Sequence, residues 1–120
     1  MLNELPSWWP ADFVGLSGGK MYFEPSAGGR LYEENGEGGH LLWSTVVMIA
    51  PGSHIDMVGP VTPAFGGPNL NFIRMSIEAA GETTKFRLTN SILGHFDGHE
   101  RVTMGWNYLF GSLKAYCEAA

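Results

Sequence analysis

The glycines of this chain gather in clusters that separate short segments rich in β-branched and aromatic residues. Glycine tolerates the positive φ angles that tight hairpin turns require, so this spacing is typical of a meandering antiparallel sheet. We expect six strands, at residues 20–24, 30–35, 41–50, 54–58, 69–79 and 83–93.

The fifth expected strand has the clearest alternation of apolar and polar residues. Ile73 and Met75 alternate with Arg74 and Ser76, which predicts a buried Ile73 face and a wet Arg74 face. The buried face should continue on the sixth strand. It should hold Asn71, Ile73, Met75 and Ile77 on one strand and Phe86, Leu88 and Ile92 on the next.

The end of the chain has a helical pattern. Apolar residues recur there at spacings of three and four, which predicts one helix at about residues 98–119, roughly 33 Å long and able to cross the sheet. Asp97 and Glu100 have the spacing of a capping box, and Gly105 should let the helix approach the sheet closely. The expected stripe consists of Val102, Trp106, Leu109, Phe110, Leu113, Tyr116 and Cys117.

Several blocks of sequence together carry a family resemblance. They are Glu24-Pro25, 28–33 (Gly-Gly-Arg-Leu-Tyr-Glu), 42–46 (Leu-Trp-Ser-Thr-Val), Ala50-Pro51, Gly105-Trp106 and 113–116 (Leu-Lys-Ala-Tyr). Across nearly the entire chain, this pattern resembles the bacterial homologues of the heat-shock-protein-90 ATPase activator. These belong to the helix-grip superfamily, with the START lipid-transfer domains, the aromatase/cyclases of polyketide synthesis and the major birch-pollen allergen.

The resemblance implies an α+β helix-grip fold, in which a curved antiparallel sheet of about six strands wraps around a long C-terminal helix. Residues 1–120 would form one such START-like domain. The family normally has a strand and a helix before the Trp8-Trp9-Pro10 segment, which here comes almost at once. Without that strand, residues 83–93 would be an exposed sheet edge, so we expect a homodimer that covers it.

The resemblance also implies a cavity between sheet and helix that takes an apolar or amphipathic small molecule. Large apolar residues in a small domain also serve as plain core. The candidates for ligand contact are Trp8, Trp9, Trp43, Met57, Phe65, Phe72, Trp106 and Phe110.

The polar candidates in such a cavity are Tyr32, Glu33, Arg74 and His95. An acid or base acting on a bound substrate would have to come from this group. The competing interpretation places Glu33, Glu34 and Arg74 on the solvated face of the sheet.

The segment from His95 to His99 has two imidazoles and the Asp97 carboxylate at alternate positions, as a metal site on an extended chain would. The cap interpretation of Asp97 is the stronger one, so we expect no metal site and no cofactor. His40 and His54 lie in or beside turns and should be surface residues. Cys117 lies on the expected buried stripe and should be a structural thiol.

The charge balance excludes two classes of partner. The net charge is -5 and the seven Lys and Arg residues are scattered, so neither nucleic acid nor a membrane surface is expected as a partner. The single cysteine, the lack of a signal-peptide pattern and the shortness of the apolar run 41–50 favour a soluble cytoplasmic protein.

These observations favour a non-enzymatic protein that binds a small apolar ligand. One alternative is an acid–base enzyme of the polyketide cyclase or dehydratase kind. Another is a chaperone-linked interaction protein, as the family name implies.

Overall fold

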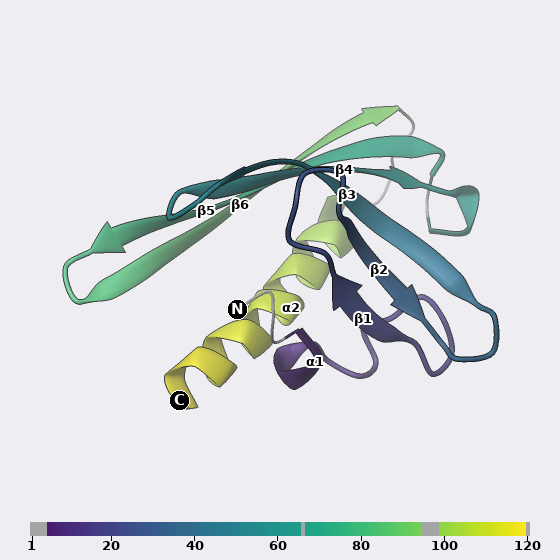
Figure 1. Cartoon of the computed structure of the whole chain (residues 1–120), viewed down its shortest axis with the longest axis horizontal. Coiled ribbons are helices and arrows are strands. Elements are labelled where there is room, and N and C mark those ends of the chain that lie inside the picture. The colour runs from purple at the N-terminus through teal and green to yellow at the C-terminus, as the bar shows by residue number, and fades with distance from the viewer. Residues whose placement is uncertain (1–4, 66, 95–98, 120) are drawn as a thin grey trace.

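The computed structural model describes residues 5–65, 67–94 and 99–119, which form one curved antiparallel sheet and a long C-terminal helix (Figure 1). The strands run in chain order across the sheet, each antiparallel to the one before. The elements are α1 (Leu5–Trp8), β1 (Lys20–Phe23), β2 (Arg30–Glu34), β3 (His40–Ala50), β4 (His54–Val61), the 3-10 helix η2 (Pro63–Phe65), β5 (Asn69–Ala80), β6 (Thr83–Gly94) and α2 (His99–Ala119).

All six expected strands are present, and the main difference is the length of β4. This strand continues beyond residue 58 to Val61, because its last residues still pair with the start of β5. Gly59 makes this possible: a Cβ atom there would lie 2.0 Å from the carbonyl oxygen of Trp43 on β3. The close approach of β3 therefore requires glycine at this position.

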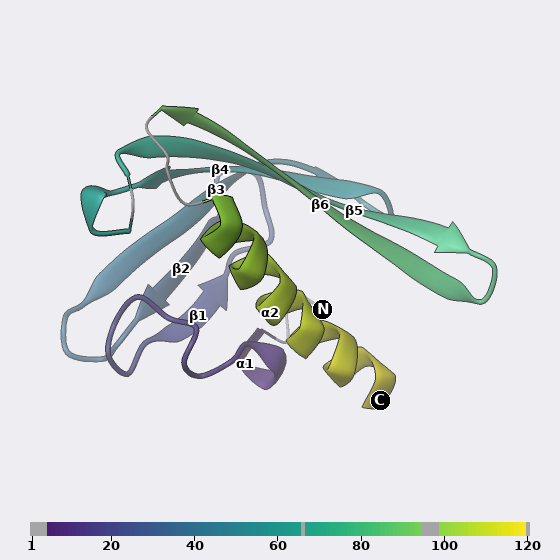
Figure 2. The same cartoon turned by 180° about the vertical axis from the view of Figure 1, so that it is seen from behind.

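Two irregularities in the ladder accompany the curvature of the sheet. The register shifts between Leu31 and Tyr32 in the β2–β3 pair, and between Val46 and Met48 in the β3–β4 pair. Such bulges bend a strand and increase its twist. The sheet accordingly curves over α2, which crosses its concave side (Figures 1 and 2).

The faces of β5 follow the predicted alternation over most of the strand. Ile73 and Met75 are buried in the core, whereas Phe72 and Arg74 are exposed on the other face. Ile77 is the exception and is exposed. It lies toward the end of the long β5–β6 hairpin, which extends away from the rest of the molecule (Figure 1).

The helix buries most of the predicted stripe. Leu109 and Leu113 are fully inside, and the half-buried Trp106, Phe110 and Tyr116 pack against the same core. Cys117 is exposed, so the prediction of a buried structural thiol is wrong. It is in the last turn of α2, beyond the part that the sheet covers (Figure 2).

Gly105 has a different neighbour from the predicted one. A Cβ atom there would meet the ring of Phe13 at 3.4 Å, so the close contact is with the N-terminal segment rather than with the sheet. The predicted cap at Asp97 lies outside the described residues.

Helix α1 lies beside α2 (Figures 1 and 2), and the segment that follows it contacts α2 through Phe13, whose ring stacks on Tyr108 with centroids 5.8 Å apart. Side chains of α2 hold it: Ser112 donates a hydrogen bond to the Trp8 carbonyl oxygen, and the Tyr108 hydroxyl donates one to Asp12 Oδ1 at 2.8 Å. The hydrogen bond to Asp12 raises the pKa of Tyr108. This segment thus forms a third wall beside the sheet and the helix.

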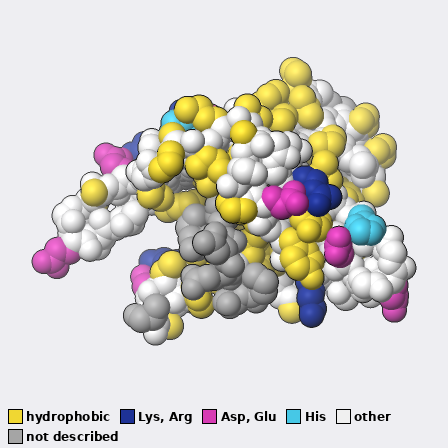
Figure 3. Space-filling model, viewed as in Figure 1, with side chains coloured by type: hydrophobic (Ala, Val, Ile, Leu, Met, Phe, Trp, Pro, Cys, Tyr) yellow, Lys and Arg dark blue, Asp and Glu magenta, His cyan; other side chains and the backbone are white. Residues whose placement is uncertain are grey.

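The distribution of surface charge and the apolar length of the helices are relevant to the expectation that neither nucleic acid nor a membrane is a partner. Charged side chains of both signs are scattered over the face seen in Figure 3, and no large area of one sign is visible there. None of the described helices is long and apolar enough to cross a membrane.

Candidate functional site

A cavity of about 960 Å³ lies between the concave face of the sheet, α2 and the N-terminal segment. Strands β3, β4 and β5 contribute its floor, through residues such as Ser44, Met57 and Ile73. Trp106 and Leu109 line it from α2.

Aromatic rings form two groups in its wall. Trp9 packs edge-on against Trp43, with ring centroids 5.7 Å apart, and Phe13 lies 6.1 Å from Trp43. On the helix, Trp106 and Phe110 stack with their planes only 8° apart and their centroids at 5.5 Å. Rings in these arrangements hold each other in fixed orientations.

Seven of the eight apolar candidates line this cavity. They are Trp8, Trp9, Trp43, Met57, Phe65, Trp106 and Phe110. Trp8 and Met57 are also buried members of the core, so the cavity wall and the core share residues.

Phe72 is not a lining residue, and the expectation that it faces the cavity is wrong. It directly precedes the inward-facing Ile73, so strand alternation places its ring on the outer face, where it is 47% exposed. An aromatic residue on the polar face of the alternation is a surface residue despite its size.

Two of the polar candidates also lie on the outer face. Tyr32 stacks on Tyr22 at 5.4 Å and carries the guanidinium of Arg30 4.3 Å above its ring. Arg74 binds both carboxylate oxygens of Asp56, at 2.7 and 2.8 Å. That pairing lowers the pKa of Asp56 and raises the pKa of Arg74.

Glu33 is neither solvated nor in contact with the cavity. Its side chain is fully buried (0% exposed), and its carboxylate accepts hydrogen bonds from the backbone N–H groups of Gly15 (2.7 Å) and Leu16 (3.3 Å) and from the Trp43 indole Nε1 (3.0 Å). Both the solvated-face interpretation and the cavity interpretation of Glu33 are therefore wrong. The carboxylate joins β2 to the N-terminal segment and holds Trp43 in the cavity wall.

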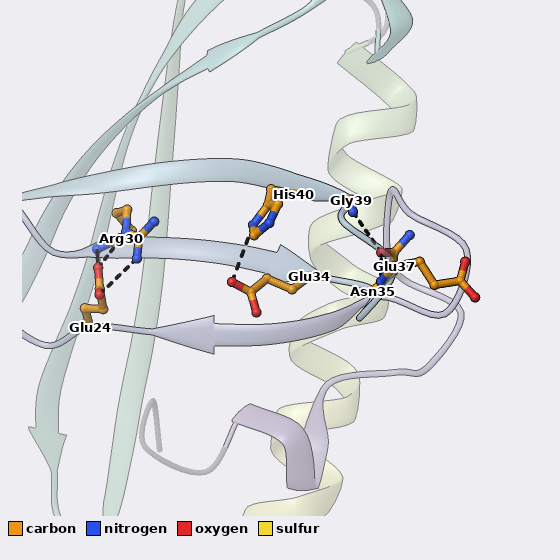
Figure 4. A network of polar contacts seen from close by, with 7 residues as sticks. All are labelled: Glu24, Arg30, Glu34, Asn35, Glu37, Gly39 and His40. Carbon is orange, nitrogen blue, oxygen red and sulfur yellow. Dashed lines mark hydrogen bonds and ion pairs between the residues drawn. The ribbon is translucent and has the colours of Figure 1, made fainter.

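The outer side of the β1–β2–β3 region carries a separate row of polar contacts (Figure 4). Glu24 binds Arg30 through two hydrogen bonds between their side chains, and this pairing lowers the pKa of Glu24. Glu34 lies 3.4 Å from Nδ1 of His40. These contacts are exposed, and they fasten neighbouring strands and turns to each other.

His54 is more enclosed than a surface residue. Its Nδ1 is 3.0 Å from the Ser53 hydroxyl and its Nε2 is 3.8 Å from Asp56 Oδ2. The second distance is too long for a hydrogen bond, and Asp56 is already bound to Arg74. The three residue types of a hydrolytic triad are thus close together without the triad geometry.

His95 and Asp97 lie outside the described residues, and nothing is described of the His99 side chain. No group of three potential metal ligands occurs among the described residues.

Polar side chains in the cavity include two asparagines that the sequence predictions did not select as site residues. Asn71 and Asn90 both line it, from β5 and β6. The signal was present in the alternation, since Asn90 occupies the even-numbered inward face between Leu88 and Ile92. The Oδ1 atom of Asn90 is buried and has no hydrogen-bond partner in the described structure.

No protein-family model matches the chain, and no curated protein matches it either. A solved structure described as an anthrahydroquino-gamma-pyrone synthase, Txn09, complexed with SUM, has a similar fold. The TM-score is 0.51 at 22% sequence identity, and the match covers 92% of this chain and 73% of that one. The fold is a helix grip. This likeness shows the fold alone, and the closer resemblance to the ATPase-activator homologues stays a prediction.

Proposed function

We propose that this helix-grip protein binds a small apolar or amphipathic molecule in the cavity between the sheet and α2. The observation that carries the proposal is the volume of about 960 Å³ that the aromatic side chains leave unfilled. Ligand pockets generally measure about 300–1,000 Å³ and are mainly apolar with a few polar groups.

The lining indicates the shape of the ligand. Trp43 on one side and the stacked Trp106 and Phe110 on another present ring faces and edges to the cavity. Flat apolar molecules pack well against such surfaces, through offset stacking and edge-to-face contacts. We therefore expect a ligand with a flat apolar body.

Binding without chemistry is favoured by the state of the titratable groups. Glu33 is held by three donors away from the cavity, and Asp12 accepts the hydrogen bond of Tyr108. His40 is among the residues around the cavity, but its side chain is 66% exposed and lies beside Glu34 in the outer row of polar contacts. A general acid or base must be free to reach the substrate, and each of these described groups is already engaged by a partner within the protein.

The alternative is an acid–base enzyme of the cyclase or dehydratase kind. The observation that favours it is the similarity in fold to a solved structure described as a synthase. His95 is the remaining candidate for its acid or base. The chaperone-linked role and the cytoplasmic location stay predictions from the sequence.

A fluorescence titration with the environment-sensitive probe Nile red tests the binding function. The wild-type protein should bind the probe with saturation, and Met57→Trp, which fills the cavity from β4, should weaken that binding at least 10-fold. Met48→Trp is the matched control, because Met48 is exposed and does not line the cavity. Circular dichroism should show that both variants are folded.

Absence of saturable binding to the wild-type protein would overturn the proposal. Equal weakening by both variants would also contradict it, because the probe would then bind outside the cavity.

A further inference from the structure

We propose that the ligand carries a hydrogen-bond donor, a hydroxyl or an N–H group, which binds the side-chain carbonyl oxygen of Asn90. This inference rests on the proposed binding function and makes the ligand class more specific. Asn90 would be the residue that distinguishes ligands with a donor from ligands of the same shape without one.

The first observation is the position of Asn90. It pairs with Ile73 across the β5–β6 ladder, and residues directly opposite each other in a ladder share one face of the sheet. Ile73 is buried and lines the cavity, and Asn90 lines it too. The amide is therefore on the concave side, among the residues that surround the ligand space.

The second observation is that this amide oxygen has no partner. Asn90 Oδ1 is buried, and no described side chain or backbone group donates a hydrogen bond to it. A buried acceptor without a donor is unfavourable, and buried polar atoms in folded proteins nearly always have partners. The oxygen is covered in the ligand-free structure, and Asn90 lines the cavity, so an occupant supplies the donor once the Asn90 side chain turns toward it.

The neighbours of Asn90 do not supply that donor. Ile73 lies opposite, and Leu88 and Ile92 flank it on the same face of β6. The nearest amide on that face is Asn71, a diagonal neighbour in the ladder. Its Nδ2 donates to Asn69 Oδ1 at 2.8 Å, and neither of its two N–H groups is hydrogen-bonded to Asn90 Oδ1.

Over the described residues of α2, the helix side of the cavity offers no competing acceptor. On the described helix face, the lining groups are Val102, Gly105, Trp106, Leu109 and Phe110, none of which offers a free acceptor side chain. Asp12 is turned to Tyr108. A ligand with a flat apolar body and one donor directed at β6 fits these groups.

Three probes of nearly equal shape test the inference: pyrene, 1-hydroxypyrene and 1-methoxypyrene. Binding is measured through energy transfer from the tryptophans that line the cavity, at mildly acidic pH so that the hydroxyl stays protonated. The wild-type protein should bind the hydroxyl probe about 10-fold more tightly than the methyl ether, as expected for one hydrogen bond to a buried acceptor.

Asn90→Leu should reduce this preference to less than 2-fold while pyrene binds at least as tightly as before. Asn107→Leu is the matched control, since Asn107 is exposed on α2 and outside the cavity lining. It should keep the wild-type preference. Asn90→Ala is the second variant if Asn90→Leu does not fold, as judged by circular dichroism.

The possible outcomes separate the role of Asn90 from the binding function itself. Equal binding of all three probes to the wild-type protein overturns this inference and leaves the binding function standing. Preference for the methyl ether overturns the assignment of the ligand as donor, and a preference that survives in both Asn90 variants overturns the role of Asn90. Binding of none of the three contradicts the proposed function itself.

Discussion

The carboxylate of Glu33 on β2 accepts a hydrogen bond from the indole Nε1 of Trp43 on β3, at 3.0 Å, in a position closed to solvent. The same carboxylate accepts the N–H groups of Gly15 and Leu16. One buried side chain thus fixes both a wall residue of the cavity and the loop beside it.

Replacement of that carboxylate by an amide should destabilise the protein. In Glu33→Gln, one oxygen becomes an N–H donor that faces other donors, so at least one buried N–H loses its acceptor. We expect the free energy of unfolding to fall by about 1–3 kcal/mol, the cost of an unsatisfied buried polar group. Urea unfolding monitored by tryptophan fluorescence measures it.

Glu34→Gln is the control for that experiment, because Glu34 makes an exposed contact with His40. Its effect should stay within about 0.5 kcal/mol, as for most surface changes. Similar losses in the two variants would contradict the role given to Glu33.

The pairing of Asp56 with Arg74 predicts a pH-dependent contribution to stability. Hydrogen bonds from Arg74 lower the pKa of Asp56 in the folded protein. A carboxylate whose folded pKa is lowered adds stability above its unfolded pKa, about 3.9, and that contribution disappears as the pH falls through the folded pKa. Arg74→Gln should therefore lower the stability at neutral pH, by the small amount expected of an exposed pair, and much less in strong acid.

Urea unfolding of Arg74→Gln across the pH range checks this expectation, and NMR titration of Asp56 should show its pKa rising in the variant. Arg87→Gln serves as the comparison, since Arg87 is exposed on β6. A loss of stability in Arg74→Gln that is the same at every pH would exclude the linkage to Asp56.

We propose that two chains associate along β6. Among the described residues this twelve-residue strand pairs only with β5, so its other edge presents backbone N–H and C=O groups to any further strand. Light scattering at micromolar concentration should give a mass of two 13.1 kDa chains. A mass equal to one chain at all concentrations tested would rule the association out.

Local patterns in the sequence predicted the sheet and the helix well. Glycine clusters and the alternation around Ile73 depend only on neighbouring residues, and they located every strand and the inward face of β5. Glu33 was misjudged because its partners come from the loop at Gly15, eighteen residues away, and no local pattern specifies that contact. Asn90 was missed because a polar residue on an inward face looks like a break in the pattern, although it is one of the polar residues that line the cavity.

The two glycines Gly59 and Gly111 should respond oppositely to alanine. At Gly59 on β4, a Cβ atom would lie 2.0 Å from the Trp43 carbonyl oxygen, which belongs to the backbone of β3 and cannot rotate away. Gly59→Ala should therefore destabilise the protein by about 3 kcal/mol, as overpacked sites do, and weaken probe binding by displacing Trp43. At Gly111 in α2 nothing lies within 4 Å of such an atom, so alanine gains helix propensity and should stabilise by about 0.5–1 kcal/mol. Urea unfolding of both variants measures the change in the free energy of unfolding. A stabilising effect of Gly59→Ala would contradict the close approach of β3 and β4 at this point.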